Sequence, residues 1–220
     1  YMFSKWVNSY RNLPIKLFQY CNIARWEEVT HPFLKGREIL WLEGHAVFAS
    51  HKDAITTIES LRRIYGGLYH DLLAIPTFCG IEPQTRKFVG SDNTYSYEAL
   101  TPNGRTLQLG AIYDLGTIFS QIYNVTFKNS NNEAEYCWGI NFGFGFRLLG
   151  ALTLIHGDDK GLVLPPNLAP IQVVFVPING KDNKGIVSKF ASEVAEELRI
   201  AGLRVHISDI TCGSMRKDRI

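Results

Sequence analysis

Apolar and polar side chains alternate along the first part of the chain in a way that predicts one broad β-hairpin. Residues 15–27 are rich in apolar and aromatic side chains, which is typical of a strand. After a loop at 30–36, residues 37–49 place every second side chain on a common face. We therefore expect two antiparallel strands that lie side by side.

Helical spacing replaces this alternation after residue 50. Ser50 and Asp53 form a capping box, and apolar residues then recur at helical spacing as far as Leu68. The pattern predicts a long helix, which Gly66 and Gly67 are expected to weaken in its last turns. Further predictions are short strands over 88–106 around a turn at 102–104, a helix over 115–125, a polar loop over 128–135, a buried strand over 136–146 and a packed helix over 148–155.

Three prolines between residues 165 and 170 mark a change of pattern. The remaining elements are an apolar strand over 171–176, an amphipathic helix over 184–201 that Gly202 stops, and another strand over 203–207. This order predicts a βαβ unit. We therefore expect an α+β domain with a mainly antiparallel sheet, followed by a second, α/β domain that begins near residue 168.

Composition and charge exclude several classes of protein. The chain has 220 residues, of which 45% are hydrophobic and 20% charged, so it is neither disordered nor collagen-like. Its 23 basic and 21 acidic side chains give no general electrostatic footprint for nucleic acid, so an RNA contact has to be local. The sequence contains no apolar run of about 18 residues, so no membrane partner is expected.

The four cysteines lie far apart and form no C-x-x-C pair. This spacing argues against a zinc site and against a disulfide framework, and it favours a reducing compartment. We expect a cytoplasmic protein, with an organellar location left open.

Candidate chemistry lies on the predicted hairpin. Arg25 and Glu27, and likewise Glu43 and His45, are two residues apart, so each pair shares one face of its strand. Because the two strands are neighbours, we expect all four side chains to face a common cleft. A guanidinium beside carboxylates can hold a phosphate and accept hydrogen bonds from an amine. The alternatives are a salt-bridged, solvated sheet face and a His/Glu/Glu metal site, for which no third ligand has a supporting spacing.

Two glycine-containing segments admit a plainer interpretation than ligand binding. Gly143, Gly145 and Gly150 miss the dinucleotide fingerprint because position 148 is leucine, so we expect close backbone packing there. Residues 156–161 combine the residue types of a metal loop and of a tight turn, and we favour the turn.

Several blocks of sequence, taken in order, resemble prolyl-tRNA synthetase of the archaeal and eukaryotic type. The blocks are LPIKL at 13–17, CNIARWE at 21–27, PFLKGRE at 32–38, WLEGH at 41–45, LAIP at 73–76 and HGDDKGLVLPP at 156–166. The resemblance covers nearly the whole chain. It implies a class II synthetase catalytic domain over 1–167, with an antiparallel sheet flanked by helices, and the start of an α/β anticodon-binding domain over 168–220.

The resemblance also implies an activity, with ATP and Mg²⁺ as cofactors. Such an enzyme activates proline to prolyl adenylate and passes the prolyl group to its tRNA, and the full-length form is expected to be a homodimer. Arg25 and Arg147 match the catalytic arginines: Arg25 holds the α-phosphate and the amino-acid carboxylate, and Arg147 the outer phosphates. Glu27 and Gln108 match further ATP-binding positions. The positions that match the substrate pocket are Trp41, Glu43, His45, Gln108, Ala111 and Tyr113.

The sequence departs from the family where the family binds its substrates. Ile39 replaces a phenylalanine that stacks on adenine, residues 111–114 (Ala-Ile-Tyr-Asp) replace Thr-Ser-His-His, and Gly145-Phe146 replaces a Ser/Thr pair. The family's first motif would lie just before Tyr1, and the similarity ends after Asp209, so we expect a fragment that is inactive in isolation. These departures support an alternative function, in which a catalytically degenerate subunit serves as an RNA- or protein-binding module in a larger assembly.

Overall fold

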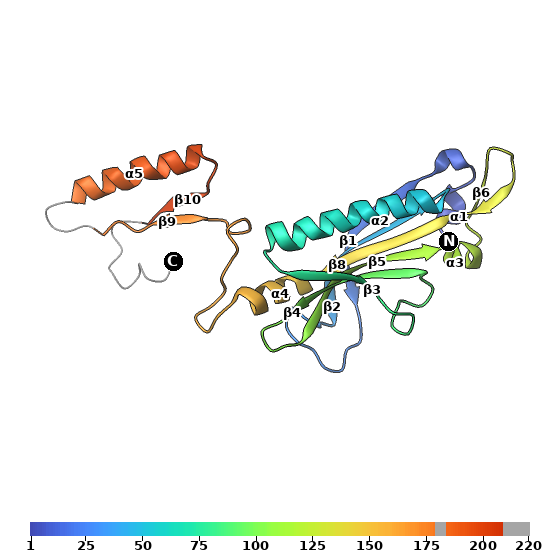
Figure 1. Cartoon of the computed structure of the whole chain (residues 1–220), viewed down its shortest axis with the longest axis horizontal. Coiled ribbons are helices and arrows are strands. Elements are labelled where there is room, and N and C mark those ends of the chain that lie inside the picture. Colours follow the sequence, from blue (N-terminus) through green and yellow to red (C-terminus); the bar gives the residue numbers. More distant parts are fainter. Residues whose placement is uncertain (179–183, 209–220) are drawn as a thin grey trace. The chain divides into compact units, whose positions relative to one another are not determined.

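The first part of the chain is built around an antiparallel sheet of six strands (Figure 1). The computed structural model describes residues 1–178 and 184–208. The sheet has the strand order β1-β2-β8-β5-β4-β3. Its strands are β1 (Ile15–Ala24), β2 (Glu38–Phe48), β3 (Thr77–Ile81), β4 (Asn93–Leu100), β5 (Thr106–Gly116) and β8 (Trp138–Gly145). The expected α+β fold with an antiparallel sheet is confirmed.

The predicted hairpin is formed by β1 and β2, but its first strand is shorter than expected. The register pairs Ile15 with Val47 and Ala24 with Glu38. The ladder ends at Ala24, and directly after it the N–H of Arg25 donates to the carbonyl oxygen of Arg37 at 2.7 Å. Arg25 and the residues after it therefore belong to the connecting loop, and the prediction of a strand through residue 27 is wrong.

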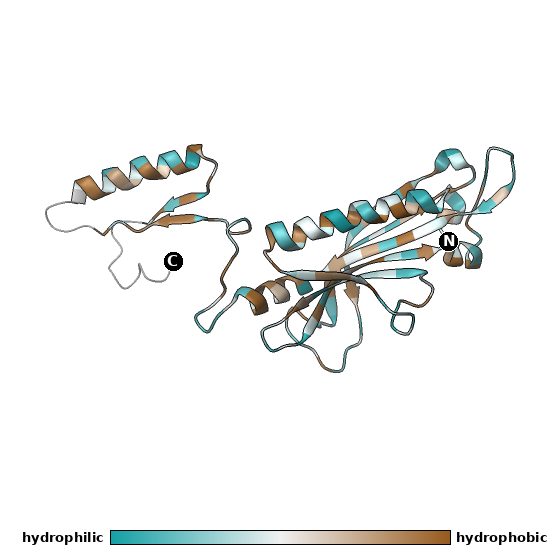
Figure 2. Cartoon of the chain, viewed as in Figure 1, coloured by the Kyte–Doolittle hydropathy of each residue, from teal (hydrophilic) through white to brown (hydrophobic). Residues whose placement is uncertain are grey.

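A long helix, α2 (His51–Gly66), packs on one face of the sheet (Figure 1). Its amphipathic pattern is visible as alternating polar and apolar colours in Figure 2. The Ser50 hydroxyl accepts a hydrogen bond from the N–H of Asp53, as the capping box predicts. At Gly66 and Gly67 the regular α-helix gives way to a π-helical stretch, η2 (Gly67–Leu72), in which fully buried Tyr69 packs against Tyr65.

Several short elements differ from the sequence-based expectations. Strand β3 was not expected, and the segment predicted to be a polar loop contributes to a small hairpin of β6 (Thr126–Lys128) and β7 (Ala134–Tyr136). The helix expected over 115–125 is confined to α3 (Ile118–Ile122), because β5 runs on to Gly116. The other helices of this part are α1 (Phe3–Trp6), η1 (Tyr10–Asn12) and α4 (Arg147–His156).

The chain divides into two units, Tyr1–Val163 and Leu164–Ile220. The second unit contains β9 (Val173–Phe175), α5 (Lys184–Ile200) and β10 (Val205–Ile207), and the two strands pair in parallel. The predicted βαβ unit is therefore confirmed, whereas the end of the family resemblance after Asp209 lies outside the described residues. No helix within 1–178 or 184–208 is long and apolar enough to cross a membrane.

Candidate active site

A cavity of about 180 Å³ opens on the face of the sheet that α2 leaves uncovered, and it brings two arginines together. Arg25 comes from the loop after β1, and Arg147 is the first residue of α4. We call this cavity the arginine cavity. The predicted site residues that line it are Arg25, Trp41, Gln108, Ala111, Tyr113 and Arg147.

Arg147 is held in place by two backbone carbonyl groups. Its Nε donates to the carbonyl oxygen of Leu34 at 2.9 Å, and its Nη1 donates to that of Gln108 at 3.2 Å. Burial lowers the pKa of the Arg147 guanidinium, and the positive charge of Arg25 lowers it further. The two positively charged guanidinium groups repel each other, and an anion bound between them would relieve this repulsion. The cavity is therefore suited to an anion.

Arg25 is the more available of the two arginines. Among the residues that the structure describes, its side chain makes no hydrogen bond and no ion pair, although its backbone N–H is bonded to Arg37. In the same described part of the chain, no carboxylate lines the arginine cavity. The fork of donors on Arg25 is therefore free for a ligand such as a phosphate or a carboxylate.

Glu27 does not join Arg25 in the cavity. Its carboxylate pairs with Lys35, with 2.9 Å between Oε2 and Nζ, and its carbonyl oxygen accepts a hydrogen bond from Arg37. The prediction that Arg25, Glu27, Glu43 and His45 share one cleft is wrong. The strand ends before Arg25, so the period-two argument does not extend to Glu27.

Gln108 and Tyr113, both on β5, form one wall of the arginine cavity. The Gln108 amide nitrogen donates to Ser96 Oγ at 2.9 Å and lies 3.3 Å from Glu82 Oε1. Burial raises the pKa of the Tyr113 phenol, nearby Glu82 and Glu43 raise it further, and Arg25 opposes them. Tyr113 is therefore a neutral hydroxyl placed between negative and positive groups.

The floor of the arginine cavity depends on glycines beneath Trp41. A Cβ at Gly143 would lie 2.8 Å from a ring carbon of Trp41, and a Cβ at Gly145 would lie 3.0 Å from another. A Cβ at Gly150 would similarly lie 2.8 Å from the carbonyl oxygen of Phe33. The prediction that these glycines serve close packing is confirmed.

A second cavity, of about 430 Å³, lies on the same face of the sheet. Because Trp41, Glu43 and His45 alternate along β2, their side chains point to one side. We call the second cavity the aromatic cavity, since its lining includes Phe3, Phe88, Phe119 and Tyr123. Glu43 and His45 line it as well. The Tyr113 ring of the first cavity packs against the Phe88 ring of the second, with 5.1 Å between centroids.

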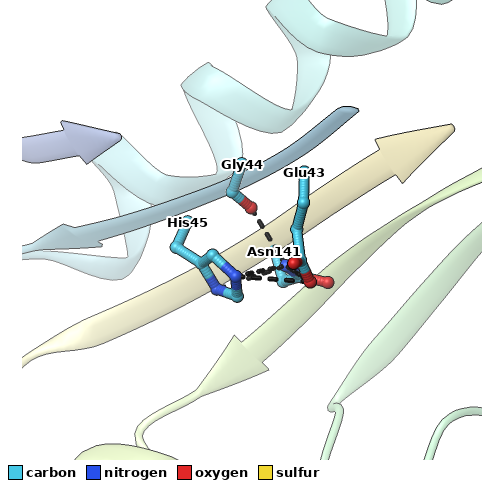
Figure 3. A network of polar contacts seen from close by, with 4 residues as sticks. All are labelled: Glu43, Gly44, His45 and Asn141. Atoms are coloured by element: carbon cyan, nitrogen blue, oxygen red, sulfur yellow. Dashed lines mark hydrogen bonds and ion pairs between the residues drawn. The ribbon is translucent and has the colours of Figure 1, made fainter. Parts of the chain in front are cut away.

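Asn141, which the sequence analysis did not identify, organises the polar side of the aromatic cavity (Figure 3). Its amide nitrogen donates to the carbonyl oxygen of Gly44 at 3.0 Å and lies 3.2 Å from His45 Nδ1 and 3.4 Å from Glu43 Oε1. His45 Nε2 is 3.3 Å from the same carboxylate oxygen. Asn141 pairs with His45 across β8 and β2, a long-range register for which the sequence carries no local signal.

The segment 156–161 forms the expected turn. Asp158 Oδ1 accepts hydrogen bonds from the N–H groups of Lys160 and Gly161. Across the described ranges, His, Cys, Asp and Glu side chains form no group of three that could hold a metal ion.

Comparisons with known proteins agree with this architecture. The family model for the tRNA synthetase class II core domain (G, H, P, S and T) matches residues 1–156. The chain is 42% identical over 202 residues to the proline–tRNA ligase of Rubrobacter xylanophilus, a match that covers 92% of this chain and 42% of that protein. It is 41% identical over 207 residues to the enzyme of the same name from Flavobacterium johnsoniae, with 94% and 42% coverage.

A solved structure shows the same similarity. The prolyl-tRNA synthetase of Cryptosporidium parvum, complexed with halofuginone and AMPPNP, superposes with a TM-score of 0.85 at 38% identity and covers 94% of this chain and 43% of that one. The chain thus spans less than half the length of the relatives that it matches. It belongs to the class II tRNA synthetase core-domain family, within the group of prolyl-tRNA synthetases.

Proposed function

We propose that the protein carrying this chain is a proline–tRNA ligase, which activates proline with ATP and transfers the prolyl group to its tRNA. The observation that carries the proposal is the meeting of Arg25 and Arg147 in one cavity on the open face of the sheet. Two guanidinium groups without a carboxylate partner in that lining suit a polyphosphate. The relatives named proline–tRNA ligase support proline as the amino acid.

In this proposal, the reaction is an in-line displacement at the α-phosphorus of ATP. A carboxylate oxygen of proline attacks the phosphorus, pyrophosphate leaves, and prolyl adenylate forms. Arg25 would hold the α-phosphate and the proline carboxylate, and Arg147 would hold the outer phosphates. Such a reaction needs positioning and charge stabilisation more than it needs a protein nucleophile.

Proline would bind where the two cavities adjoin. Trp41 offers an apolar surface for the ring, and Glu43 offers a carboxylate for the ammonium group. Tyr113 and His45 complete the surroundings of this position. The aromatic cavity would then accept the end of the tRNA to which the prolyl group is transferred.

Mg²⁺ would neutralise charge on the ATP phosphates and orient them for attack. This ion keeps several waters and needs only one or two protein carboxylates when it binds with a nucleotide, so a three-ligand cluster is not required. Glu82 fits this need, because the Gln108 side chain in the wall of the arginine cavity lies within hydrogen-bonding distance of it. The donor set is thus compatible with nucleotide-bound Mg²⁺.

The proposal extends to a homodimer. Phe18, Tyr20 and Leu40 lie on one face of the β1–β2 hairpin and are 67%, 79% and 69% exposed. An exposed apolar patch of this kind marks a surface for a partner. A second copy of the chain is the proposed occupant, and light scattering of the wild type and of a Tyr20→Lys variant would test it.

Charging of tRNA with labelled proline tests the proposed function. The complete gene product should charge tRNA, and Arg25→Ala should abolish charging. Arg105→Ala is the matched control, since Arg105 is an exposed arginine in the turn between β4 and β5. A complete gene product that folds but charges no tRNA would refute the proposal.

A further inference from the structure

We infer that Phe146 is the side chain on which the base of the bound nucleotide stacks. The inference rests on the proposed function, because it assigns a place to the adenine of ATP within the arginine cavity. Phe146 lines that cavity together with apolar Leu34 and Ile39. We call the part of the cavity that these three side chains line its apolar corner. Ile39 has no aromatic face, so the stacking surface of this corner is the Phe146 ring.

The other aromatic side chains of the cavity, Trp41 and Tyr113, are those proposed to surround proline. The Trp41 ring lies on the backbone of Gly143 and Gly145, in the floor of the cavity. Tyr113 packs against Phe88 and lies in the electrostatic field of Glu82 and Glu43, at the end proposed for the amino acid. An adenine needs an apolar slot for its π-face, and the corner that contains Phe146 provides one.

The Phe146 ring is held by the loop between β1 and β2 before any ligand arrives. Its edge-on contact with Phe33 has 6.1 Å between centroids and an interplanar angle of 70°. A Cβ at Gly36 would lie 3.2 Å from the tip of the ring, so the ring fits where that glycine leaves room. A ring held in this way loses little conformational freedom when a base stacks on it.

Phe146 also stands next to the arginine proposed for the outer phosphates. Its N–H donates to the carbonyl oxygen of Leu40 at 3.0 Å, and Arg147 follows at the start of α4. A base surface and a phosphate ligand therefore come from consecutive residues of one fixed backbone. This arrangement would set the position of the base relative to the phosphates.

Calorimetric titration of the complete gene product with ATP and with tripolyphosphate tests the inference, because tripolyphosphate carries the charge but no base. Phe146→Ala should weaken ATP binding roughly 5- to 100-fold, the range produced by loss of an aromatic partner for a base. Tripolyphosphate binding should stay within about twofold of the wild type. Phe146→Tyr should retain ATP binding, since it keeps the ring.

Phe33→Ala is the matched control. It removes the same ring-to-ring contact, but Phe33 lies in the loop between β1 and β2. We expect this variant to bind ATP within a fewfold of the wild type. If Phe146→Ala does not fold, Phe146→Leu replaces it, and the same selective loss of ATP binding is expected.

Two results would overturn the inference while the proposed function stands: undiminished ATP binding by the Phe146 variants, or an equal loss for ATP and tripolyphosphate. The second result would mean that Phe146 only supports the arginines. A wild type that binds neither ATP nor tripolyphosphate would instead refute the proposed function and the inference together.

Discussion

Arg147 Nε donates a 2.9 Å hydrogen bond to the carbonyl oxygen of Leu34, so the first residue of α4 is tied to the loop that follows β1. The two residues are 113 positions apart in the sequence. The bond uses one donor of the guanidinium and fixes its plane, and a second donor binds the Gln108 carbonyl. The donors that remain are therefore aimed by the backbone before a phosphate binds.

Replacement of Arg147 should weaken ATP binding. Charge-assisted hydrogen bonds of this kind contribute about 1.5 to 3 kcal/mol, so we expect Arg147→Ala to bind ATP roughly 10- to 100-fold more weakly. Arg147→Lys should recover part of this loss, because it keeps the charge but not the fork. Calorimetry checks both variants against Arg105→Ala, and undiminished binding by Arg147→Ala would refute the assignment.

A methyl group at Gly143 should disturb the floor of the arginine cavity. Its Cβ would lie 2.7 Å from the carbonyl oxygen of Leu42 and 2.8 Å from a ring carbon of Trp41. We expect Gly143→Ala to lower the free energy of unfolding by about 1 to 3 kcal/mol, which is typical of overpacking. Urea unfolding measures this change.

Gly80→Ala on β3 is the matched control, because no atom lies within 4 Å of the added Cβ. Gly80→Ala should leave the unfolding midpoint nearly unchanged. Equal midpoints for the two variants would contradict the packing argument at Gly143.

Local patterns predicted the elements that bury one face. The β1–β2 hairpin and α2 have a buried side and a polar side, so their periods are legible in the sequence. Strand β3 was missed because it is largely exposed and contains Gly80, which leaves no alternation to detect. The meeting of Arg25 with Arg147 depends on long-range pairing, so only the resemblance to a family could indicate it.

The division of the site into two cavities was beyond the sequence. Tyr113 of the arginine cavity and Phe88 of the aromatic cavity pack against each other but lie on different segments of the chain. Asn141 was missed because aromatic residues and glycines dominate β8 and hide its polar position. Glu27 was misplaced because the strand was predicted to extend beyond Ala24.

Replacement of Asn141 should raise the KM for proline more than the KM for ATP. Asn141→Ala removes the donor to Gly44 and leaves Glu43 and His45 without the amide between them. We expect the KM for proline to rise roughly tenfold, the effect of one lost hydrogen bond in a partly buried site. The KM for ATP should stay within about twofold, since Asn141 lines the aromatic cavity. Equal rises in both KM values would contradict this division.

Stability should fall at alkaline pH in part because of Cys137. Burial raises the pKa of its thiol from 9.0 to about 11, so the unfolded chain loses this proton at lower pH than the folded chain. Between these values, folding stability should decrease by about 1.4 kcal/mol per pH unit from this group.

Urea unfolding between pH 8 and 11 measures the effect of Cys137. Cys137→Ala should show a shallower decline than the wild type. The buried tyrosines, whose pKa values are also raised by burial, are shared by both proteins and cancel in the comparison. Parallel declines would show that Cys137 does not contribute.

Proline-dependent exchange of pyrophosphate into ATP tests the central claim most directly, because it reports formation of prolyl adenylate without tRNA. The account predicts that the complete gene product exchanges label only when proline is present, and that Arg25→Ala abolishes the exchange while Arg105→Ala does not. A folded, ATP-binding gene product whose exchange is absent or does not depend on proline would contradict it.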